Sequence, residues 1–279
     1  MSESDSERFK ESCAQDGDGK PIHPAEGSFP ILHRLGPTQL IIVGTGFWIS
    51  RYGLFFTAGH VVDELIEKGG ELSRAYAFHW AREGKIHLRV IRSVTRLHAA
   101  DLAIGQADNY VDKFPDAPLP TKRAKLTTSV PAIGSKLVTF AYPENEVLEF
   151  SGDEPPVIRG DRFEGVLLRN VTKSDHPYIP YPYLETSIEV RSGASGGPVF
   201  DDRGRVVGVN CRGWDFRGTE HEDNPLSSIV PIGEAMPMEV PVVQLPSNSW
   251  EGSQVPAARR GKPLTLAELA AYGHVAFEL

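Results

Sequence analysis

The sequence predicts an all-β fold, arranged as barrels or as a sandwich, and three observations support this prediction. About a dozen short segments are rich in β-branched and aromatic residues and end at glycine, proline or charged turn residues. Hardly any stretch has the apolar spacing of a long helix, and strands do not alternate with helices as a parallel α/β sheet requires. The 279 residues suffice for one large β domain or two smaller ones with a sizeable core.

The composition argues against several classes of function. A formal net charge of -8, with no basic stripe, does not favour binding to nucleic acid or to an anionic membrane. No apolar run is long enough to span a bilayer, and residues 1–7 lack the basic and apolar regions of a secretory signal. The two cysteines, Cys13 and Cys211, lie in a polar leader and in an apolar strand, which does not favour a disulfide framework. We therefore expect a soluble, cytoplasmic protein.

The first half of the chain shows a leader, a hairpin, one helix and further strands. Residues 1–27 are polar, acidic and broken by glycine and proline, which predicts a mobile leader. Residues 39–50 and 54–57 predict two strands of a hairpin. Residues 58–66 have helical spacing that two glycines stop, which predicts a short helix. Strand-like segments follow at residues 74–80, 86–97 and 101–104.

The second half begins after a proline-rich linker at residues 108–124 and again shows short strands. They are expected at residues 136–141, 162–169, 183–190, 206–211 and 227–232. A capping-box pattern at Thr265 then predicts a helix near the C-terminus. The expected organisation is a leader (1–27), a first β domain (28–115), a second β domain (116–240) and an irregular tail with a terminal helix (241–279).

A serine among glycines, at residues 193–198, carries the strongest chemical signal. Glycine lets the backbone turn tightly and brings N–H groups close to the Ser195 hydroxyl. A nucleophilic serine needs such donors for the oxygen that becomes negative when a carbonyl is attacked. A glycine-rich turn without chemistry has the same composition, so the interpretation depends on a base and an acid elsewhere.

His60 and Asp101 are the candidates for that base and that acid. His60 stands between an apolar strand and the predicted helix, which would hold it rigidly, and histidine titrates near neutral pH. Asp101 begins an apolar run, where a carboxylate is costly unless it has a partner, and a carboxylate can orient an imidazole. Asp63, three residues after His60 on the helix, is expected to face solvent, and Asp108 is the reserve candidate.

Three motifs together resemble those of chymotrypsin-fold (trypsin-like) serine proteases, particularly the disulfide-poor bacterial kind. In the family's order they are Thr57-Ala58-Gly59-His60-Val61, Asp101-Leu102-Ala103-Ile104 and Gly193-Ala194-Ser195-Gly196-Gly197-Pro198. The segment Gly44-Thr45-Gly46-Phe47 also resembles the strand before the family's histidine. This resemblance, over roughly residues 28–240, implies two antiparallel six-stranded β-barrels with the cleft between them.

The resemblance implies a serine endopeptidase that acts through a His60–Asp101–Ser195 triad and an acyl-enzyme intermediate. Ser195 would attack the scissile carbonyl, His60 would act as base and then as acid, and Asp101 would orient His60. The backbone N–H groups of Gly193 and Ser195 would form the oxyanion hole. The substrate would be a protein or peptide, and no metal or other cofactor is implied.

Two departures from the family's pattern concern maturation. Val61 follows the histidine where secreted members have a cysteine, and Ala194 precedes the serine where an aspartate often pairs with a newly freed N-terminus. Nothing near Pro30 resembles such an N-terminus. We infer that this protein does not mature by that switch.

Side-chain preference stays open at this stage. The resemblance places Glu189 and Val190 on one wall of the specificity pocket, and Cys211, Arg212 and Gly213 on the other. Glu189 would favour a basic side chain, whereas Arg212 could favour an acidic one, neutralise Glu189 or point to solvent. The backbone of residues 211–213 is expected to pair with extended substrate as an added strand.

Three alternatives remain beside the protease. The G-x-S-x-G elbow of an α/β-hydrolase esterase needs a helix after the serine, but Pro198 and a turn follow here. A metal hydrolase would rest on His60 and Asp63 alone. A catalytically silent, protease-like binding module is compatible with all the motifs, because backbone geometry sets the oxyanion hole. The termini, 1–27 and 241–279, are where we expect contacts with a regulatory protein partner or self-inhibition.

Overall fold

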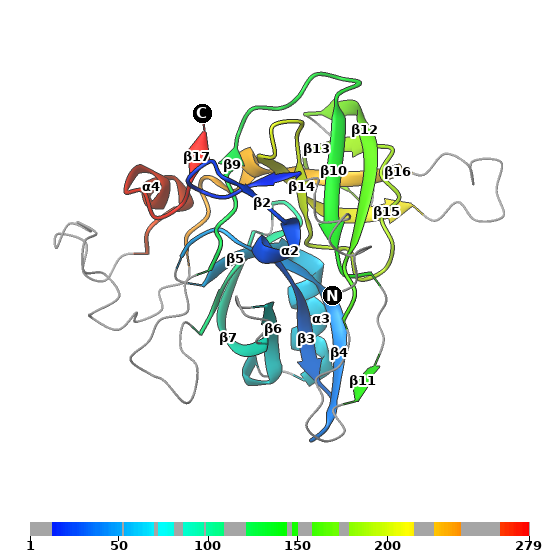
Figure 1. Ribbon diagram of the computed structural model, residues 1–279, viewed down its shortest axis with the longest axis vertical. Helices are drawn as coiled ribbons and strands as arrows, with labels where there is room; N and C mark the ends of the chain where they lie inside the picture. Colours follow the sequence, from blue (N-terminus) through cyan, green and yellow to red (C-terminus); the bar gives the residue numbers. More distant parts are fainter. Residues whose placement is uncertain are drawn as a thin grey trace.

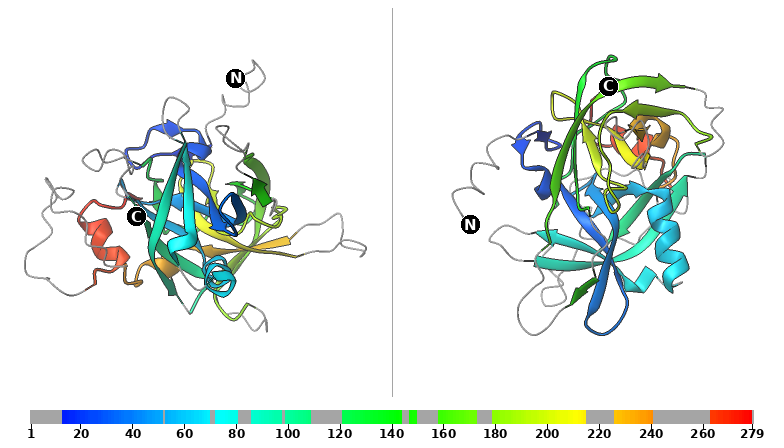
Figure 2. Two further views of the ribbon diagram at one scale, coloured as in Figure 1. Left: turned by 90° about the horizontal axis from the view of Figure 1, so that it is seen from below. Right: turned by 90° about the vertical axis from the view of Figure 1, so that its right-hand side faces the viewer.

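The structure, a computed structural model, shows two β-barrels, one above the other in Figure 1. It describes residues 13–51, 53–69, 72–80, 86–97, 99–108, 121–143, 147–149, 158–172, 179–214, 226–240 and 263–278. Helices are few and short, and they lie outside the barrels; α3, for example, lies on the outside of the first barrel in both views of Figure 2.

The first barrel is a closed ring of six antiparallel strands. They are β3 (Ser28–Arg34), β4 (Gln39–Trp48), β5 (Leu54–Ala58), β6 (Ala75–Trp80), β7 (Ile86–Leu97) and β8 (Leu102–Ala107). The strands pair in the order β4-β3-β6-β7-β8-β5, and pairing of β4 with β5 closes the ring. A further strand, β11 (Val147–Glu149), pairs with the first residues of β4, which do not pair with β5.

Aromatic side chains fill this barrel, and glycines make room for them. The rings of Phe29 and Trp48 stack with centroids 4.0 Å apart, and Phe55 meets Phe29 edge-on at 5.4 Å. A Cβ on Gly46 would lie 2.8 Å from the Phe29 ring, and one on Gly105 would lie 2.2 Å from the Phe55 ring. Glycine at these two positions therefore lets the strands approach the rings.

The second barrel is also a closed ring of six antiparallel strands. They are β10 (Lys136–Ala141), β12 (Asp161–Val171), β13 (Tyr183–Thr186), β14 (Pro198–Phe200), β15 (Val206–Trp214) and β16 (Leu226–Pro231). The order is β14-β10-β12-β13-β16-β15, and pairing of β14 with β15 closes the ring. Two short parallel strands, β9 (Leu126–Thr127) and β17 (Phe277–Glu278), extend the sheet beyond β15. The two rings confirm the predicted fold class.

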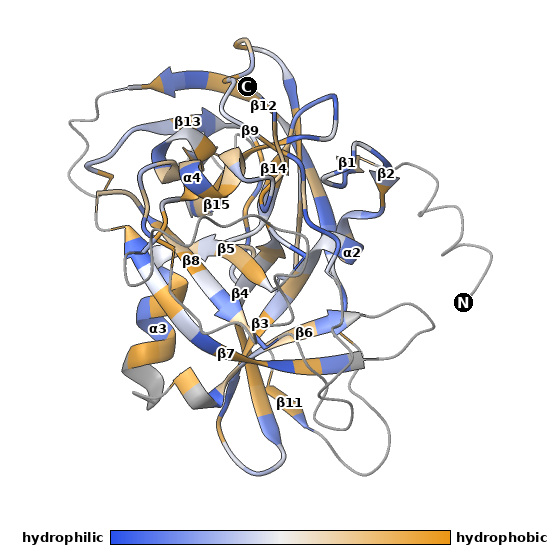
Figure 3. Cartoon of the chain, turned by 90° about the vertical axis from the view of Figure 1, so that its left-hand side faces the viewer, coloured by the Kyte–Doolittle hydropathy of each residue, from blue (hydrophilic) through white to orange (hydrophobic). Residues whose placement is uncertain are grey.

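The helices agree with the sequence patterns. α3 (Gly59–Gly69) follows β5 directly, and hydrophobic and hydrophilic bands alternate along it in Figure 3. α4 (Leu266–Ala271) begins with the predicted capping box, in which the Thr265 hydroxyl accepts the Glu268 N–H. This helix confirms the predicted C-terminal helix. The remaining short helices are α2 (Pro24–Gly27), η1 (Leu72–Arg74) and η3 (Ile232–Ala235).

The prediction of a mobile leader was wrong for residues 13–27. β1 (Ala14–Gln15) and β2 (Pro21–Ile22) form a hairpin, and α2 follows it. The Gln15 N–H donates to the Gly204 carbonyl oxygen at 2.7 Å, and the Asp16 carboxylate accepts two N–H groups of its own turn. The polar residues that suggested disorder therefore cap a turn and dock the hairpin on the second barrel.

The predicted domain limits need one further correction. β11 lies within the predicted second domain, residues 116–240, but it pairs with β4 of the first barrel. The predicted boundary between residues 115 and 116 and the irregular segment 241–262 lie outside the described residues, as do residues 1–12.

Candidate active site

Neighbouring elements place a histidine and an aspartate side by side. β5 ends at Ala58 and α3 begins at the next residue, so His60 lies in the first turn of the helix. β8 begins directly after Asp101 and pairs antiparallel with β5, with Leu102 opposite Ala58. The strand register therefore brings the start of α3 next to Asp101.

Two hydrogen bonds join Asp101 to His60. Asp101 Oδ2 lies 2.7 Å from His60 Nδ1, and the His60 backbone N–H donates to Asp101 Oδ1 at 2.8 Å. The Asp101 side chain is 8% exposed and the His60 side chain 40% exposed, so the carboxylate is enclosed while the imidazole reaches solvent. A neutral imidazole held by a carboxylate at Nδ1 keeps its proton there and offers Nε2 as an acceptor.

The Asp101 carboxyl group is ionised at neutral pH. Burial by itself raises its pKa, but the hydrogen bond and charge of His60, the His60 backbone N–H and the charge of Arg96 outweigh burial. The pKa of Asp101 therefore lies below its usual 3.8. Asp108, the reserve candidate, instead forms an ion pair with Arg92 at 2.5 Å, which leaves Asp101 as the partner of His60.

The turn before β14 presents Ser195 and depends on glycine. Gly193 and Gly196 have φ angles of 85° and 89°, in the left-handed region that other residues rarely adopt. A Cβ on Gly196 would lie 2.1 Å from the Thr45 carbonyl oxygen, so the first barrel packs directly against this turn. Within the described residues, the N–H groups of Gly193 and Ser195 donate to no protein acceptor, which leaves them able to bind a ligand oxygen.

Thr45, in β4, connects the serine turn to the first barrel. Its N–H donates to the Ser195 carbonyl oxygen at 2.8 Å, and its hydroxyl donates to the Gly193 carbonyl oxygen at 2.9 Å. The Thr57 hydroxyl donates to the Thr45 carbonyl oxygen at 2.8 Å. Sequence reasoning missed this role of Thr45; the available signal was a polar residue within an apolar strand, which implies a buried hydrogen bond.

Cys211, in β15, touches both halves of the site. Its thiol donates to the Asp101 carbonyl oxygen at 3.1 Å, and its own carbonyl oxygen accepts the Ser195 hydroxyl at 3.3 Å. Burial and the nearby charge of Asp101 raise the pKa of the thiol, so it stays protonated and can donate. Among the described contacts the Ser195 hydroxyl makes no hydrogen bond to His60.

The predicted pocket residues do not all come together. Glu189 is exposed and forms an ion pair with Arg191 at 3.1 Å, and no described contact joins it to Arg212. The Arg212 side chain is exposed on β15. Val190 and Gly213 do meet, because a Cβ on Gly213 would lie 2.5 Å from the Val190 carbonyl oxygen. The expected walls therefore touch, and the Glu189 charge lies at the surface rather than between them.

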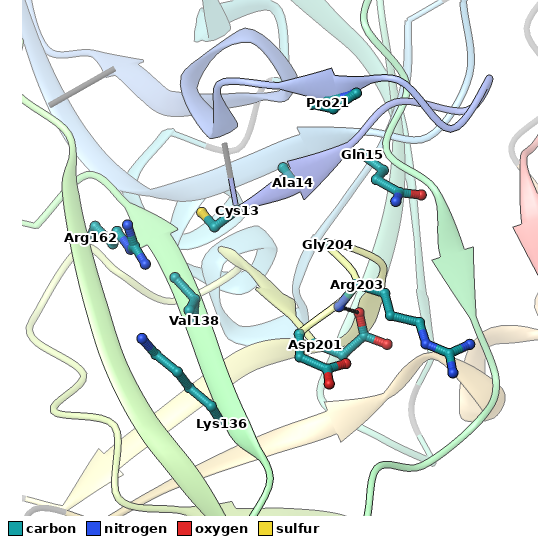
Figure 4. A pocket seen from close by; sticks show the side chains of 11 residues that line it. Cys13, Ala14, Gln15, Pro21, Lys136, Val138, Arg162, Asp201, Arg203 and Gly204 are labelled. Atoms are coloured by element: carbon teal, nitrogen blue, oxygen red, sulfur yellow. Dashed lines mark hydrogen bonds between the residues drawn. The ribbon is translucent and has the colours of Figure 1, made fainter. Parts of the chain in front are cut away.

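A polar cavity of about 470 Å³ lies elsewhere, between the N-terminal hairpin and the second barrel. Figure 4 shows Cys13 on one side of it and Lys136 and Arg162 on the other. Both cations pair with the single carboxylate of Glu164. None of the residues that line the cavity belongs to the predicted site.

The described part of the chain offers neither a metal cluster nor a membrane-spanning helix. No cluster of three or more His, Cys, Asp or Glu side chains there could hold a metal ion. No helix there has both the length and the apolar character needed to cross a membrane.

Comparison with known proteins settles the family. Residues 44–209, more than half of the chain, match the trypsin-like peptidase domain. The chain belongs to this family. The trypsin-like peptidase fold also matches a solved structure described as the crystal structure of Deg5, with a TM-score of 0.52 and 17% sequence identity, over 75% of this chain and 85% of that chain. At such low identity this second likeness shows the fold alone, and no curated protein matches the sequence.

Membership of the trypsin-like peptidase family confirms the predicted family and class of enzyme, a trypsin-like serine protease acting on protein or peptide. The matched residues run from β4 to β15 and include His60, Asp101 and Ser195. The fold also removes the esterase alternative, because β14 follows Ser195 where an α/β-hydrolase elbow needs a helix.

Proposed function

We propose that this trypsin-like peptidase is an endopeptidase that works through a His60–Asp101–Ser195 triad and an acyl-enzyme intermediate. The observation that carries the proposal is the enclosed Asp101 carboxylate, which holds His60 by two hydrogen bonds. The serine turn is fixed to the same barrel through Thr45, and Cys211 contacts both Ser195 and Asp101, which supports Ser195 as the nucleophile.

The chemistry follows from these positions. The Ser195 hydroxyl turns from the Cys211 carbonyl towards His60, loses its proton to Nε2 and attacks the scissile carbonyl carbon. Asp101 stabilises the imidazolium that forms, and the free N–H groups of Gly193 and Ser195 receive the oxyanion. His60 then gives its proton to the leaving amine, and water attacks the acyl-enzyme with His60 again as base. Both products leave, and Ser195 regains its proton.

The test is a comparison of new N-termini in a denatured protein mixture treated with wild-type protein or with Ser195→Ala. The proposal predicts new N-termini with wild-type protein only. Equal sets of N-termini from the two samples would reject it.

A silent, protease-like binding module is the second candidate function. The observation that favours it is the Ser195 hydroxyl, which is directed to the Cys211 carbonyl oxygen rather than to His60. This candidate predicts that wild-type protein retains extended peptides but cleaves none of them.

We further propose a reducing, cytoplasmic location and a regulatory protein partner at the terminal segments. Support for the location comes from Cys13 and Cys211, neither of which forms a disulfide, and Cys211 contacts the candidate site. Fractionation of the cells that make the protein tests the location. Capture of a partner by the full chain, but not by residues 28–240 alone, tests the role of the termini.

A further inference from the structure

Arg96, near the end of β7, lies close to Asp101, the buried member of the His60–Asp101 pair. β7 pairs with β8 so that Arg96 faces Ala103, two residues after Asp101. The guanidinium group donates to Asp63 Oδ1 at 2.7 Å, and Asp63 stands on α3 one turn after His60. Asp63 was expected to face solvent, but it anchors this arginine.

Gly59 leaves the space that Arg96 occupies. A Cβ at this position would lie 2.8 Å from Arg96 Nε and 2.9 Å from Asp101 Oδ1, closer than real Cβ atoms approach other atoms. Any side chain directly before His60 would therefore displace the arginine, the aspartate or both. Arg96 Nε is buried there without a hydrogen-bond partner among the described residues.

The Arg96–Asp63 pair differs from most surface ion pairs, because Arg96 Nε is buried. An exposed Arg–Asp pair contributes little, and burying Arg96 Nε without a partner is a cost. Arg96 nevertheless lies close to Asp101, because both groups approach the same point beside Gly59, and its charge lowers the pKa of Asp101 in addition to the larger effects of His60, against the opposing effect of burial. Arg96 therefore lies near two carboxylates: that of Asp63, which accepts a hydrogen bond from its guanidinium group, and that of Asp101 in the candidate site.

We propose that Arg96 is a positioning residue of the active site: set in the space beside Gly59 and anchored by Asp63, it fixes the Asp101 carboxylate against His60. The inference rests on the proposed triad. Among the described residues, the charged and titratable groups that interact with Asp101 are His60 from α3, Arg96 from β7, Cys211 from β15 and Tyr181 before β13. Asp63 and Arg212 lie next to this group, Asp63 paired with Arg96 and Arg212 acting on Cys211 and Tyr181.

The kinetic test compares Arg96→Gln, Arg96→Lys and the control Arg92→Gln. Arg92 lies on the same strand and forms an exposed ion pair with Asp108. We expect Arg96→Gln to lower kcat about 10–100-fold with KM changed less than threefold, because a displaced catalytic group costs about that much. Arg96→Lys is expected to recover part of the loss, and Arg92→Gln to stay within twofold of wild type.

The pH profile separates positioning from loss of fold. Removing a positive charge makes the free enzyme's base easier to protonate, so the acid limb of kcat/KM should move to higher pH in Arg96→Gln. An unchanged limb with kcat within twofold of wild type would overturn the proposal.

A titration that needs no turnover tests the role of Arg96 separately from the proposed endopeptidase activity. In the Ser195→Ala background, carboxyl NMR of carbon-13-labelled aspartate is expected to show a higher pKa for Asp101 when Arg96 is glutamine. The same Asp101 pKa in both proteins would overturn the role of Arg96. Absence of cleavage by wild-type protein, together with the expected titration shift, would reject the endopeptidase activity but support the effect of Arg96 on Asp101.

Discussion

At the scale of single residues, a few hydrogen bonds hold His60 and Asp101 in one relative position. Asp101 uses one carboxylate oxygen for the His60 ring and the other for the His60 backbone, so position and tautomer are fixed together. The Cys211 thiol supports the Asp101 backbone from the other barrel. Each of these groups is inside the protein except the His60 imidazole, which reaches solvent.

The first prediction concerns Asp101→Asn. Asparagine has only one acceptor oxygen: when this oxygen accepts the His60 backbone N–H, the NH2 group faces Nδ1 and donates to it. The imidazole then takes the wrong tautomer, and kcat should fall by about 10⁴. Steady-state kinetics on a peptide substrate measures the loss, and circular dichroism checks the fold. A loss of less than tenfold would contradict the role of Asp101.

A second prediction concerns His79, which is buried in the first barrel against Trp48. Burial, and then the charges of Arg89 and His87, lower the pKa of His79 from 6.5 to about 3. The folded protein keeps this imidazole neutral in that interval while the unfolded chain takes up a proton. The group therefore destabilises the fold as pH falls from 6.5 towards 3, by about 1.4 kcal/mol per pH unit.

Urea unfolding of wild-type protein and of His79→Phe at pH 7.5 and pH 4.5 tests this effect. Phenylalanine retains a ring against Trp48 but cannot titrate, so the variant should lose less stability between the two pH values. An equal loss in both proteins would show that His79 titrates normally.

At the scale of elements, β15 and the segment before the serine turn, predicted to be the two walls of a specificity pocket, touch each other. Val190 packs on the second barrel's core, and its carbonyl oxygen lies against Gly213 of β15. The Glu189 and Arg191 side chains pair with each other at the surface instead of entering the gap. If these segments are the pocket walls, we expect a large substrate side chain to enter only when they separate.

The third prediction is a preference for small residues, such as alanine and serine, on the acyl side of the cleaved bond. A peptide library with that position varied measures it by the ratio of kcat/KM values. Each methylene that the closed gap excludes is expected to cost about 1–3 kcal/mol in specificity. Preference for lysine or arginine would contradict the observed contact and restore Glu189 as a determinant.

At the scale of the whole molecule, both described ends of the chain dock on the segment that leads into the second barrel. β17 pairs with β9, and Glu278 forms ion pairs with Lys125 and Arg205 at 2.6 Å each. Figure 1 shows β2 from the N-terminal hairpin close to this place. The N-terminal hairpin and β17 thus pack close to the segment through which the chain enters the second barrel.

The fourth prediction concerns a truncated protein that ends at residue 262. It loses α4 and β17, and with them the buried side chains of Leu266, Leu269 and Val275. We expect the free energy of unfolding to fall by about 2–4 kcal/mol, allowing for the chain entropy that offsets this burial. Urea unfolding measures it. Unchanged stability would contradict the docking role, and a rise in kcat would instead indicate self-inhibition by the tail.

Much of this organisation followed from the sequence because it rests on local patterns. Short strands, turn residues and the motifs around His60, Asp101 and Ser195 predicted the fold class, and the structure joins His60 to Asp101. The docked hairpin at residues 13–27 was not predictable in this way, because hydrogen bonds to Gly204 and to the linker, distant in sequence, hold it. The same holds for Arg96, whose position depends on the packing of β7 against α3.

The central claim is that Ser195 is a nucleophile activated by His60. The most direct measurement is mass spectrometry of the protein after reaction with a fluorophosphonate probe, with the modified residue mapped after digestion. We expect one adduct, on Ser195, in wild-type protein, and none in His60→Ala or Ser195→Ala. Absence of an adduct in wild-type protein, or equal labelling of the His60→Ala variant, would contradict it.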